Sequence, residues 1–304
     1  MFPHNEFKYY SFGLRTGLAN FFKNGLALGA RKTLGKISQP VNAYSRFPEY
    51  YWFDQALRHY LQGIPSAQDI KVLDVGSPKM FGLYLGQKIK ADILLTDISE
   101  INIDEYKVMW RALEPGARGK VQFALQDARS LKFPDAAFDL VYSMSVIEHI
   151  EGEGGDSQAM RELLRVLKPG GLLAVSVPFS SHYLEQKRIG FSGAARKTGD
   201  QEAYFFQRIY DADAFQRQIL SQTGGLEQIK LVVVARRNQW LSRGFGKLGE
   251  NARGALGFLN PLFSVLINHS NEGMNGSVKG SYGPFHTACD VYGDLIFTGR
   301  KKQL

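Results

Sequence analysis

The feature that most constrains the fold of this chain is a short apolar segment that runs into a glycine turn. Residues 71–76 are Lys-Val-Leu-Asp-Val-Gly, which predicts a buried strand ending at Gly76, and the residues after it suit a helix. A second apolar strand, 92–96, ends directly before Asp97. In an open parallel sheet, ligands bind at the carboxyl ends of the strands, and a carboxylate about 20 residues beyond the first glycine turn is placed to bind a ribose. The segment therefore predicts a site for a ligand that carries an adenosine.

Apolar runs alternate with helical segments along the middle of the chain. The predicted strands are 71–76, 92–96, 121–126, 138–143 and 172–178. The predicted helices between them are 78–89, 101–113 and 156–168. Near-continuous apolar strands separated by helices indicate a parallel sheet that is covered on both faces. The later elements are a helix capped by Asp211 or Asp213 that runs to about Thr223, and strands at 228–234 and 291–298.

The chain divides into four predicted units. They are a basic helical arm (1–65), a ligand-binding core (66–240), an inserted cap (241–290), and a final strand with a basic tail (291–304). The segment 241–290 is rich in Gly and Asn and is too long for a structureless loop in a compact domain, which is why we expect a cap.

The arm has an unusual charge pattern, because no acidic residue occurs from Phe7 to Pro48. Its apolar residues recur at nearly helical spacing, and they are Leu14, Leu18, Phe21, Phe22 and Leu26. An amphipathic helix packed on the core is the first interpretation, a helix on a membrane surface is the second, and an organelle-targeting sequence is the third. A further helix is predicted from Glu49 to Leu61.

The composition limits the compartment and the partners. The single Cys289 permits no internal disulfide and fits a reducing compartment. The net charge of +8 favours an anionic partner or surface without specifying nucleic acid. No apolar run approaches the roughly 20 residues of a membrane span, and the first residues lack the compact apolar core of a secretory signal. We therefore expect a cytoplasmic location, with peripheral membrane contact through the arm as the alternative.

The turn after the first strand argues against a dinucleotide. A nicotinamide-binding turn needs Gly-x-Gly-x-x-Gly, so that a pyrophosphate can approach bare backbone. Here Gly76 is followed by Ser77 and Pro78, and Pro78 removes an amide that a pyrophosphate would use. Ser77 and Pro78 instead suit the cap and first turn of the next helix. This turn suits a ligand without a pyrophosphate, such as S-adenosylmethionine.

Five ordered motifs together resemble the class I S-adenosylmethionine-dependent methyltransferases. They are Val72–Gly76, Asp97, Gln126-Asp127-Ala128, Phe138–His149 and Leu163–Pro178. The likeness is to the small-molecule branch that contains quinone-pathway O-methyltransferases, and it covers about residues 66–235 and the final strand. The resemblance implies a Rossmann-like, doubly wound, seven-stranded α/β sheet with the last strand antiparallel. It also implies S-adenosylmethionine as the cofactor.

The resemblance further implies which residues bind the cofactor. They are Asp74, Val75, Gly76 and Ser77 in the first turn, Asp97 and Ile98 after the second strand, Asp127 and Ala128 after the third, and Ser143 in the fourth. Asp74 would meet backbone amides and the cofactor's ammonium, Asp97 the ribose, and Asp127 the adenine amino group. The structural alternatives are that Asp74 only ties down its turn, that Asp97 caps a helix, and that Asp127 caps the turn before Arg129.

One departure from the family pattern supports a second hypothesis. Glycines usually stand where this chain has Pro78 and Met80, which would fit a degraded, non-catalytic binding module. The acidic residues that a bound cofactor requires are all present, and this favours a working site.

Methyl transfer from a sulfonium is an in-line displacement, and a general base assists it when the acceptor is a hydroxyl. His149 after the fourth strand is the first candidate base and His182 after the fifth is the second; a structural, hydrogen-bonded histidine is the alternative for both. Ser145 stands where a metal-binding relative would have an acid, so no metal is predicted. Ser143-Met144-Ser145-Val146 also lacks the Pro-Pro motif of nucleic-acid base methyltransferases, so nucleic acid is not expected. We expect a methyltransferase that acts on a small-molecule, glycan or lipid-linked acceptor.

Overall fold

A computed structural model describes residues 11–12, 46–64, 70–188, 203–236, 268–274 and 291–303. Its helices are α3 (Arg46–Gln62), α4 (Met80–Lys88), α5 (Glu100–Leu113), α6 (Gly155–Val166) and the short α7 (Ala212–Ala214). Its strands are β1 (Lys71–Val75), β2 (Asp92–Asp97), β3 (Lys120–Leu125), β4 (Phe138–Met144), β5 (Leu167–Ser180), β6 (Leu184–Arg188), β7 (Tyr204–Ile209), β8 (Leu226–Arg236), β9 (Asn268–Met274) and β10 (Val291–Lys301).

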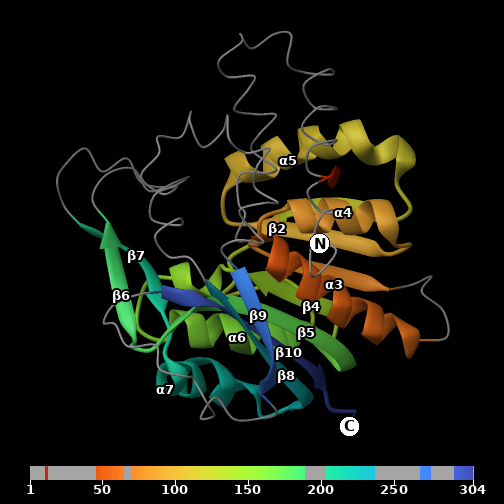
Figure 1. Ribbon diagram of the computed structural model, residues 1–304. Coiled ribbons are helices and arrows are strands. Elements are labelled where there is room, and N and C mark those ends of the chain that lie inside the picture. The colour runs from red at the N-terminus through yellow and green to blue at the C-terminus, as the bar shows by residue number, and fades with distance from the viewer. Residues whose placement is uncertain are drawn as a thin grey trace.

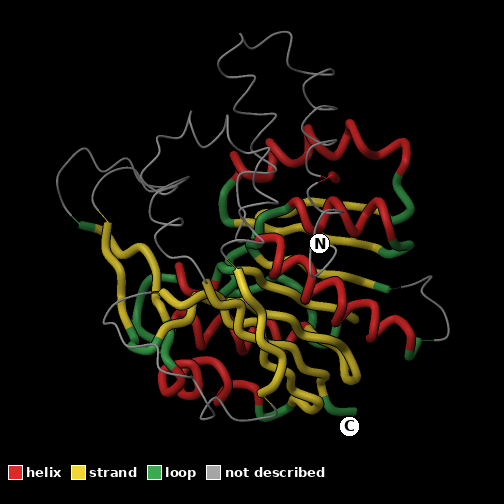
Figure 2. The backbone as a smooth tube through the Cα atoms, in the orientation of Figure 1, coloured by secondary structure: helices red, strands yellow, loops and turns green. Residues whose placement is uncertain are grey.

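The main sheet has the strand order β3-β2-β1-β4-β5-β10-β8-β9 (Figures 1 and 2). Strands β1 to β5 run parallel, and β10 lies antiparallel between β5 and β8. The predicted seven-stranded α/β sheet with an antiparallel last strand is therefore confirmed. An eighth strand of this sheet was not predicted: β9 pairs with β8 at the edge and comes from the segment where we expected a cap. The rest of 241–290 lies outside the described residues.

The two faces of the sheet are covered by different helices (Figure 1). Helices α3, α4 and α5 pack on one face, where Leu57, Leu83 and Trp110 are buried. Helix α6 and the segment that begins with α7 pack on the other, where Leu163 and Phe215 are buried. Each such side chain contributes about 1.5–3 kcal/mol by leaving water. This two-sided burial is why the strands are apolar at nearly every position.

The first helix after β1 begins later than predicted. Helix α4 starts at Met80 rather than at residue 78, and its N-cap is Lys79. The predicted capping role of Ser77 is wrong, because the Ser77 hydroxyl accepts a hydrogen bond of 2.9 Å from the Met144 amide of β4. Ser77 and Pro78 therefore belong to the turn itself, which ties β1 to β4 at their carboxyl ends.

The structure adds a two-stranded antiparallel hairpin, β6 and β7, in the polar segment that follows β5. The hairpin is joined to the loop after β4, because Arg208 donates to the carbonyl oxygens of Ile150 and Gly152 at 2.6 Å each. Just beyond it, the Tyr210 hydroxyl donates to the buried Asp156 at 2.7 Å. The chain then turns into α7, which Asp211 caps by accepting from the Ala214 amide, as predicted. A π-helical turn and a 3-10 turn continue it to Thr223.

The arm before the core is described only in part. Helix α3 covers the predicted helix and begins a turn earlier, and its Phe53 and Leu57 are buried against the sheet. Phe12 packs edge-on against Tyr84 of α4, with ring centroids 5.5 Å apart. The amphipathic pattern between Leu14 and Leu26 lies outside the described residues. None of the described helices is both long and apolar enough to cross a membrane.

Candidate functional site

The turn after β1 is shaped by Gly76. Its φ is +74°, a left-handed conformation that glycine adopts without strain. Its amide donates to the Thr96 carbonyl of β2 at 2.9 Å. A Cβ at this position would lie 2.6 Å from Val146 Cγ1, which is far inside van der Waals contact. Both the conformation and the space therefore require glycine here.

Asp74 is fully buried in β1, directly before this turn. Its Oδ1 accepts from the Ser77 amide at 2.9 Å and from the Lys79 ammonium at 3.2 Å. Burial raises the pKa of the Asp74 carboxyl, and the nearby charge of Lys79 opposes that shift. Asp74 thus meets a backbone amide, as predicted, and ties down the turn; its contact with the cofactor's ammonium stays a prediction. The hydroxyl of Ser143 donates to the Val75 carbonyl at 2.9 Å and fastens the same turn to β4.

Asp97 ends β2 at the carboxyl edge of the sheet. Its Oδ1 accepts from the Ser99 amide at 2.9 Å, and its side chain is 12% exposed. Ser99, not Asp97, caps α5, so the alternative of Asp97 as a helix cap is wrong. Ile98 is 70% exposed, and Leu125, the residue of β3 in register with Asp97, is 50% exposed. This arrangement suits an adenosine. The carboxylate can accept hydrogen bonds from the ribose hydroxyls, and the aliphatic side chains can contact the apolar faces of the adenine.

Asp127 follows β3 and lies in the loop next to Asp97, because the Gln126 amide donates to the Asp97 carbonyl. Its carboxylate binds the Arg129 guanidinium at 2.7–3.2 Å and accepts from the Arg129 amide at 2.9 Å. The bonds from Arg129 hold the pKa of Asp127 below its ordinary value. The structure thus shows the turn-capping role, and the adenine contact of Asp127 and of its half-buried neighbour Ala128 stays a prediction.

The two candidate bases lie at the carboxyl ends of neighbouring parallel strands, β4 and β5. His149 Nδ1 is 2.6 Å from the Phe206 carbonyl oxygen of β7. A carbonyl oxygen only accepts hydrogen bonds, so Nδ1 carries a proton, and in the neutral ring the lone pair is on Nε2, which lies 3.7 Å from Glu148 Oε1. His182 is exposed, and its amide donates to Ser180 Oγ at 3.2 Å. The base role of either histidine stays a prediction.

Sequence reasoning missed two charged residues at this edge. Lys79 is fully buried, with its ammonium between Asp74 and Asp97. Glu49 of α3 is also fully buried and accepts hydrogen bonds from the hydroxyls of Ser145, directly after β4, and Ser176, the residue of β5 in register with Met144. Glu49 is the first acid after the acid-free arm, which is a weak signal, and no motif marks Lys79. Within the described ranges, no group of three or more acidic, histidine or cysteine side chains is placed to hold a metal.

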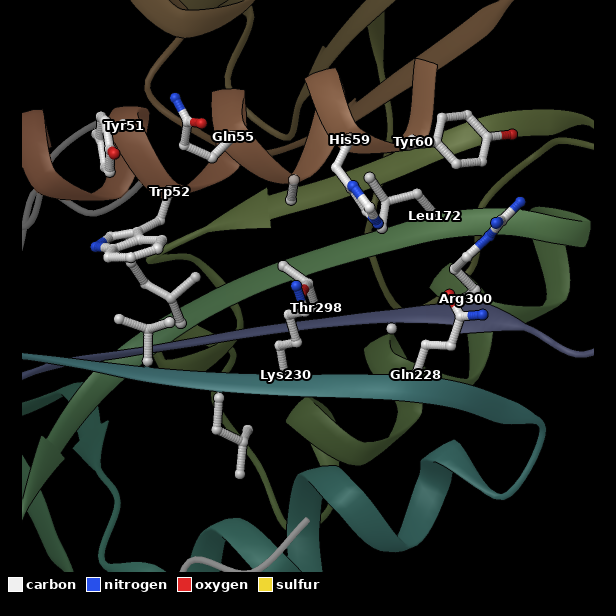
Figure 3. A pocket seen from close by; sticks show the side chains of 15 residues that line it. Tyr51, Trp52, Gln55, His59, Tyr60, Leu172, Gln228, Lys230, Thr298 and Arg300 are labelled. Carbon is white, nitrogen blue, oxygen red and sulfur yellow. The ribbon is translucent and has the colours of Figure 1, made fainter. Parts of the chain in front are cut away.

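A groove of about 490 Å³ lies elsewhere, between α3 and the strands β8 and β10 (Figure 3). Trp52 and His59 point into it from the helix, and Lys230 points into it from β8. Arg300 lines one end, and it is in register with Leu172, near the start of β5. That end of β5 is opposite the edge that carries Asp97, so the groove is separate from the cofactor residues.

A mainly parallel sheet with an antiparallel last strand, a glycine turn after β1 and a partly exposed carboxylate at the end of β2 fit the class I S-adenosylmethionine-dependent methyltransferases that the five motifs resemble. Residues 73–175 match the family described as Methyltransferase domain, so this part of the chain carries a methyltransferase domain. The cofactor of the class is S-adenosylmethionine, and the Asp97 edge fits its adenosine.

Individual relatives share part of the chain. A sterol 24-C-methyltransferase of Gibberella zeae is 31% identical over 160 residues, which are 48% of this chain and 40% of the relative. A 2-methyl-6-phytyl-1,4-hydroquinone methyltransferase of Synechocystis sp. is 30% identical over 184 residues, 50% of this chain and 55% of the relative. A solved methyltransferase structure from Methanosarcina mazei is similar with a TM-score of 0.48 at 16% identity, covering 82% of this chain and 97% of the other. The chain thus spans about half the length of the two curated relatives, or less.

Proposed function

We propose that this protein transfers the methyl group of S-adenosylmethionine to a small-molecule acceptor. The observation that carries the proposal is the edge at which Asp97 lies between the exposed side chains of Ile98 and Leu125. The side chains of Ile98 and Leu125 are 70% and 50% exposed, so a flat adenine would find apolar contacts beside the carboxylate that accepts from its ribose. The match of 73–175 to a methyltransferase domain supports the same function.

The relatives support an apolar acceptor. Their names specify a sterol and a phytyl hydroquinone, both of which are lipid-like ring compounds. The acid-free stretch of the basic arm, residues 7–48, suits contact with an anionic membrane surface, and lipid-like acceptors dissolve in such a membrane. We therefore propose a lipid-type acceptor rather than a glycan, and a cytoplasmic protein that contacts the membrane peripherally. Co-sedimentation with anionic vesicles tests the contact, and a protein that stays in the supernatant would contradict it.

The chain's own residues would do three things in this reaction. Bound S-adenosylmethionine supplies a methyl group on a positively charged sulfur. Asp97 would accept hydrogen bonds from the ribose and so fix the cofactor, and Gly76 would give the turn the left-handed conformation that the site requires. His149 Nε2 takes the proton of an acceptor hydroxyl, because its other ring nitrogen is held by Phe206. A carbon acceptor would lose its proton to the same nitrogen.

Calorimetric titration with S-adenosylmethionine tests the cofactor site. The near-isosteric Asp97→Asn removes the charge that accepts from the ribose, and we expect the affinity to fall about 10- to 100-fold. Asp92→Asn is the matched control, because Asp92 begins the same strand and is exposed at the opposite edge. Equal affinities for the two variants would contradict the role of Asp97.

Turnover separates the enzyme from the alternative of a non-catalytic binding module. The purified protein is incubated with S-adenosylmethionine carrying a labelled methyl group and with lipid, glycan or water-soluble metabolite fractions. We expect label in the lipid fraction. Cofactor binding with no label in any fraction would support the binding module, and label in the glycan fraction would correct the acceptor class.

A further inference from the structure

A lysine lies inside the cofactor site, and its side chain is completely buried. The ammonium of Lys79 is 3.2 Å from Asp74 Oδ1 and 3.6 Å from Asp97 Oδ2, and it donates to the Ser77 carbonyl oxygen. Lysine is almost never fully buried unless its charge is paired. Here one ammonium faces two carboxylates, which belong to neighbouring parallel strands, β1 and β2. The lysine therefore joins the two strand ends that carry the predicted cofactor carboxylates.

The turn around Lys79 is held by side chains instead of glycines. Pro78 has no amide hydrogen, and Met80 already begins α4. The Ser77 amide is bound to Asp74, and its hydroxyl to the Met144 amide. The Lys79 ammonium closes the turn by binding the carbonyl of Ser77 and the carboxylate of Asp74. In this chain, hydrogen bonds made by the side chains of Asp74, Ser77 and Lys79 therefore fix the turn.

The position of Asp97 depends on this arrangement. Asp97 Oδ1 is fixed by the Ser99 amide at 2.9 Å, whereas Oδ2 is held only loosely by the Asn102 side chain at 3.4 Å and faces Lys79. Without the ammonium, the buried Asp74 would lose its charged partner, and Asp97 Oδ2 would keep only the long contact with Asn102, so the orientation of Asp97 would no longer be fixed.

We propose that Lys79 is a positioning residue of the cofactor site: its buried ammonium holds Asp74 and Asp97 together and fixes the turn in which Pro78 and Met80 stand in place of the usual glycines. The proposal rests on the proposed function, because it assigns Asp97 to the ribose. Pro78 and Met80 are then compatible with a working site although the family usually has glycines there, because the ammonium of Lys79 keeps both carboxylates in place. Lys79 acts on the cofactor through Asp97 and does not contact the acceptor.

A double-mutant cycle tests the proposal, with S-adenosylmethionine affinity measured by calorimetry for wild type, Lys79→Met, Asp97→Asn and the pair. Methionine keeps the length of the stem and removes the charge. We expect Lys79→Met to weaken binding about tenfold in the wild-type background and less than about twofold in the Asp97→Asn background, because coupled residues are not additive. Lys88→Met, at the exposed end of α4, is the control and should bind as wild type does.

Two results would overturn the proposal: Lys79→Met with the affinity of wild type, or a loss of the same size in both backgrounds. General destabilisation by Lys79→Met would produce the second result, so the cycle separates positioning from folding. If wild type itself binds no cofactor, the proposed function fails, and the ion pair is then judged from unfolding alone. Lys79→Met should unfold at lower urea than wild type, and Asp74→Asn added to it should restore stability; no loss and no restoration would refute the pairing.

Discussion

Gly76→Ala is the change whose cost can be worked most directly from this structure. The added Cβ would lie 2.6 Å from Val146 Cγ1, where carbon atoms normally approach no closer than about 3.5 Å. Overpacking of this kind costs about 1–3 kcal/mol of unfolding free energy. Alanine at a φ of +74° costs about 1–2 kcal/mol more. Together we expect a loss of about 2–5 kcal/mol, a large part of the 5–15 kcal/mol typical of native proteins.

Gly154→Ala is the matched control, because Gly154 has a similar φ of +67° and nothing within 4 Å of an added Cβ. Urea unfolding of both variants should show a loss of about 1–2 kcal/mol for Gly154→Ala and a clearly larger one for Gly76→Ala. Val146→Ala added to Gly76→Ala removes both Cγ atoms and should recover the difference. Equal losses for the two alanine variants would refute the close contact between the turn and Val146.

Two further predictions concern protonation. Arg165 lowers the pKa of Glu162 below its ordinary 4.5, so the pair stabilises the fold above that pH and the contribution is lost as the pH falls through the folded pKa. Glu162→Gln should therefore cost about 1 kcal/mol at pH 7 in urea unfolding and approach wild type as the pH falls below 4.5 and through the folded pKa of Glu162, whereas a difference that stays constant on acidification would contradict the pairing. His149→Asn keeps a donor for the Phe206 carbonyl and removes the base; kcat should fall about 10²–10⁴-fold with little change in the KM for S-adenosylmethionine, and wild-type kcat would show that His149 is structural.

The fold could be predicted because its signals are local. Each strand of the parallel half is an apolar run bounded by a turn, and the predicted limits lie within a few residues of the observed ones for β1 to β4. Strand β5 is longer than predicted, because Lys168-Pro169-Gly170-Gly171 indicates a helix end and a turn, whereas the structure pairs both Leu167 and Leu172 with β4 across a register shift. The hairpin strand β6 is Leu-Glu-Gln-Lys-Arg and mostly exposed, so it lacks the apolar alternation that marks a strand.

The residues of the candidate site also fall into those that local sequence signals predict and those that long-range contacts place. Gly76 and Asp97 follow strands directly, and their places could be predicted from the turn and the spacing alone. Ser77 was assigned to the wrong partner, because its bond runs to Met144, 67 residues away. Glu49 bonds to Ser145 and Ser176, which are 96 and 127 residues away. Hydrogen bonds between residues so far apart in the chain follow no repeating pattern in the sequence, so only the folded structure shows them.

Among the described residues, the surroundings of the candidate base His149 are fixed by such long-range contacts. The β6–β7 hairpin holds the backbone of Ile150 and Gly152 through Arg208, and its Phe206 holds the His149 ring both by a hydrogen bond and by edge-on packing at 5.0 Å. A change in the hairpin therefore moves the candidate base without touching the cofactor residues on β1 and β2. Because the hairpin is a separate two-stranded sheet, its sequence can vary while the main sheet keeps its register. In the proposed function, this separation lets the acceptor change on a constant cofactor site, which is why the motifs on β1 and β2 predict a cofactor whereas no motif predicts the acceptor.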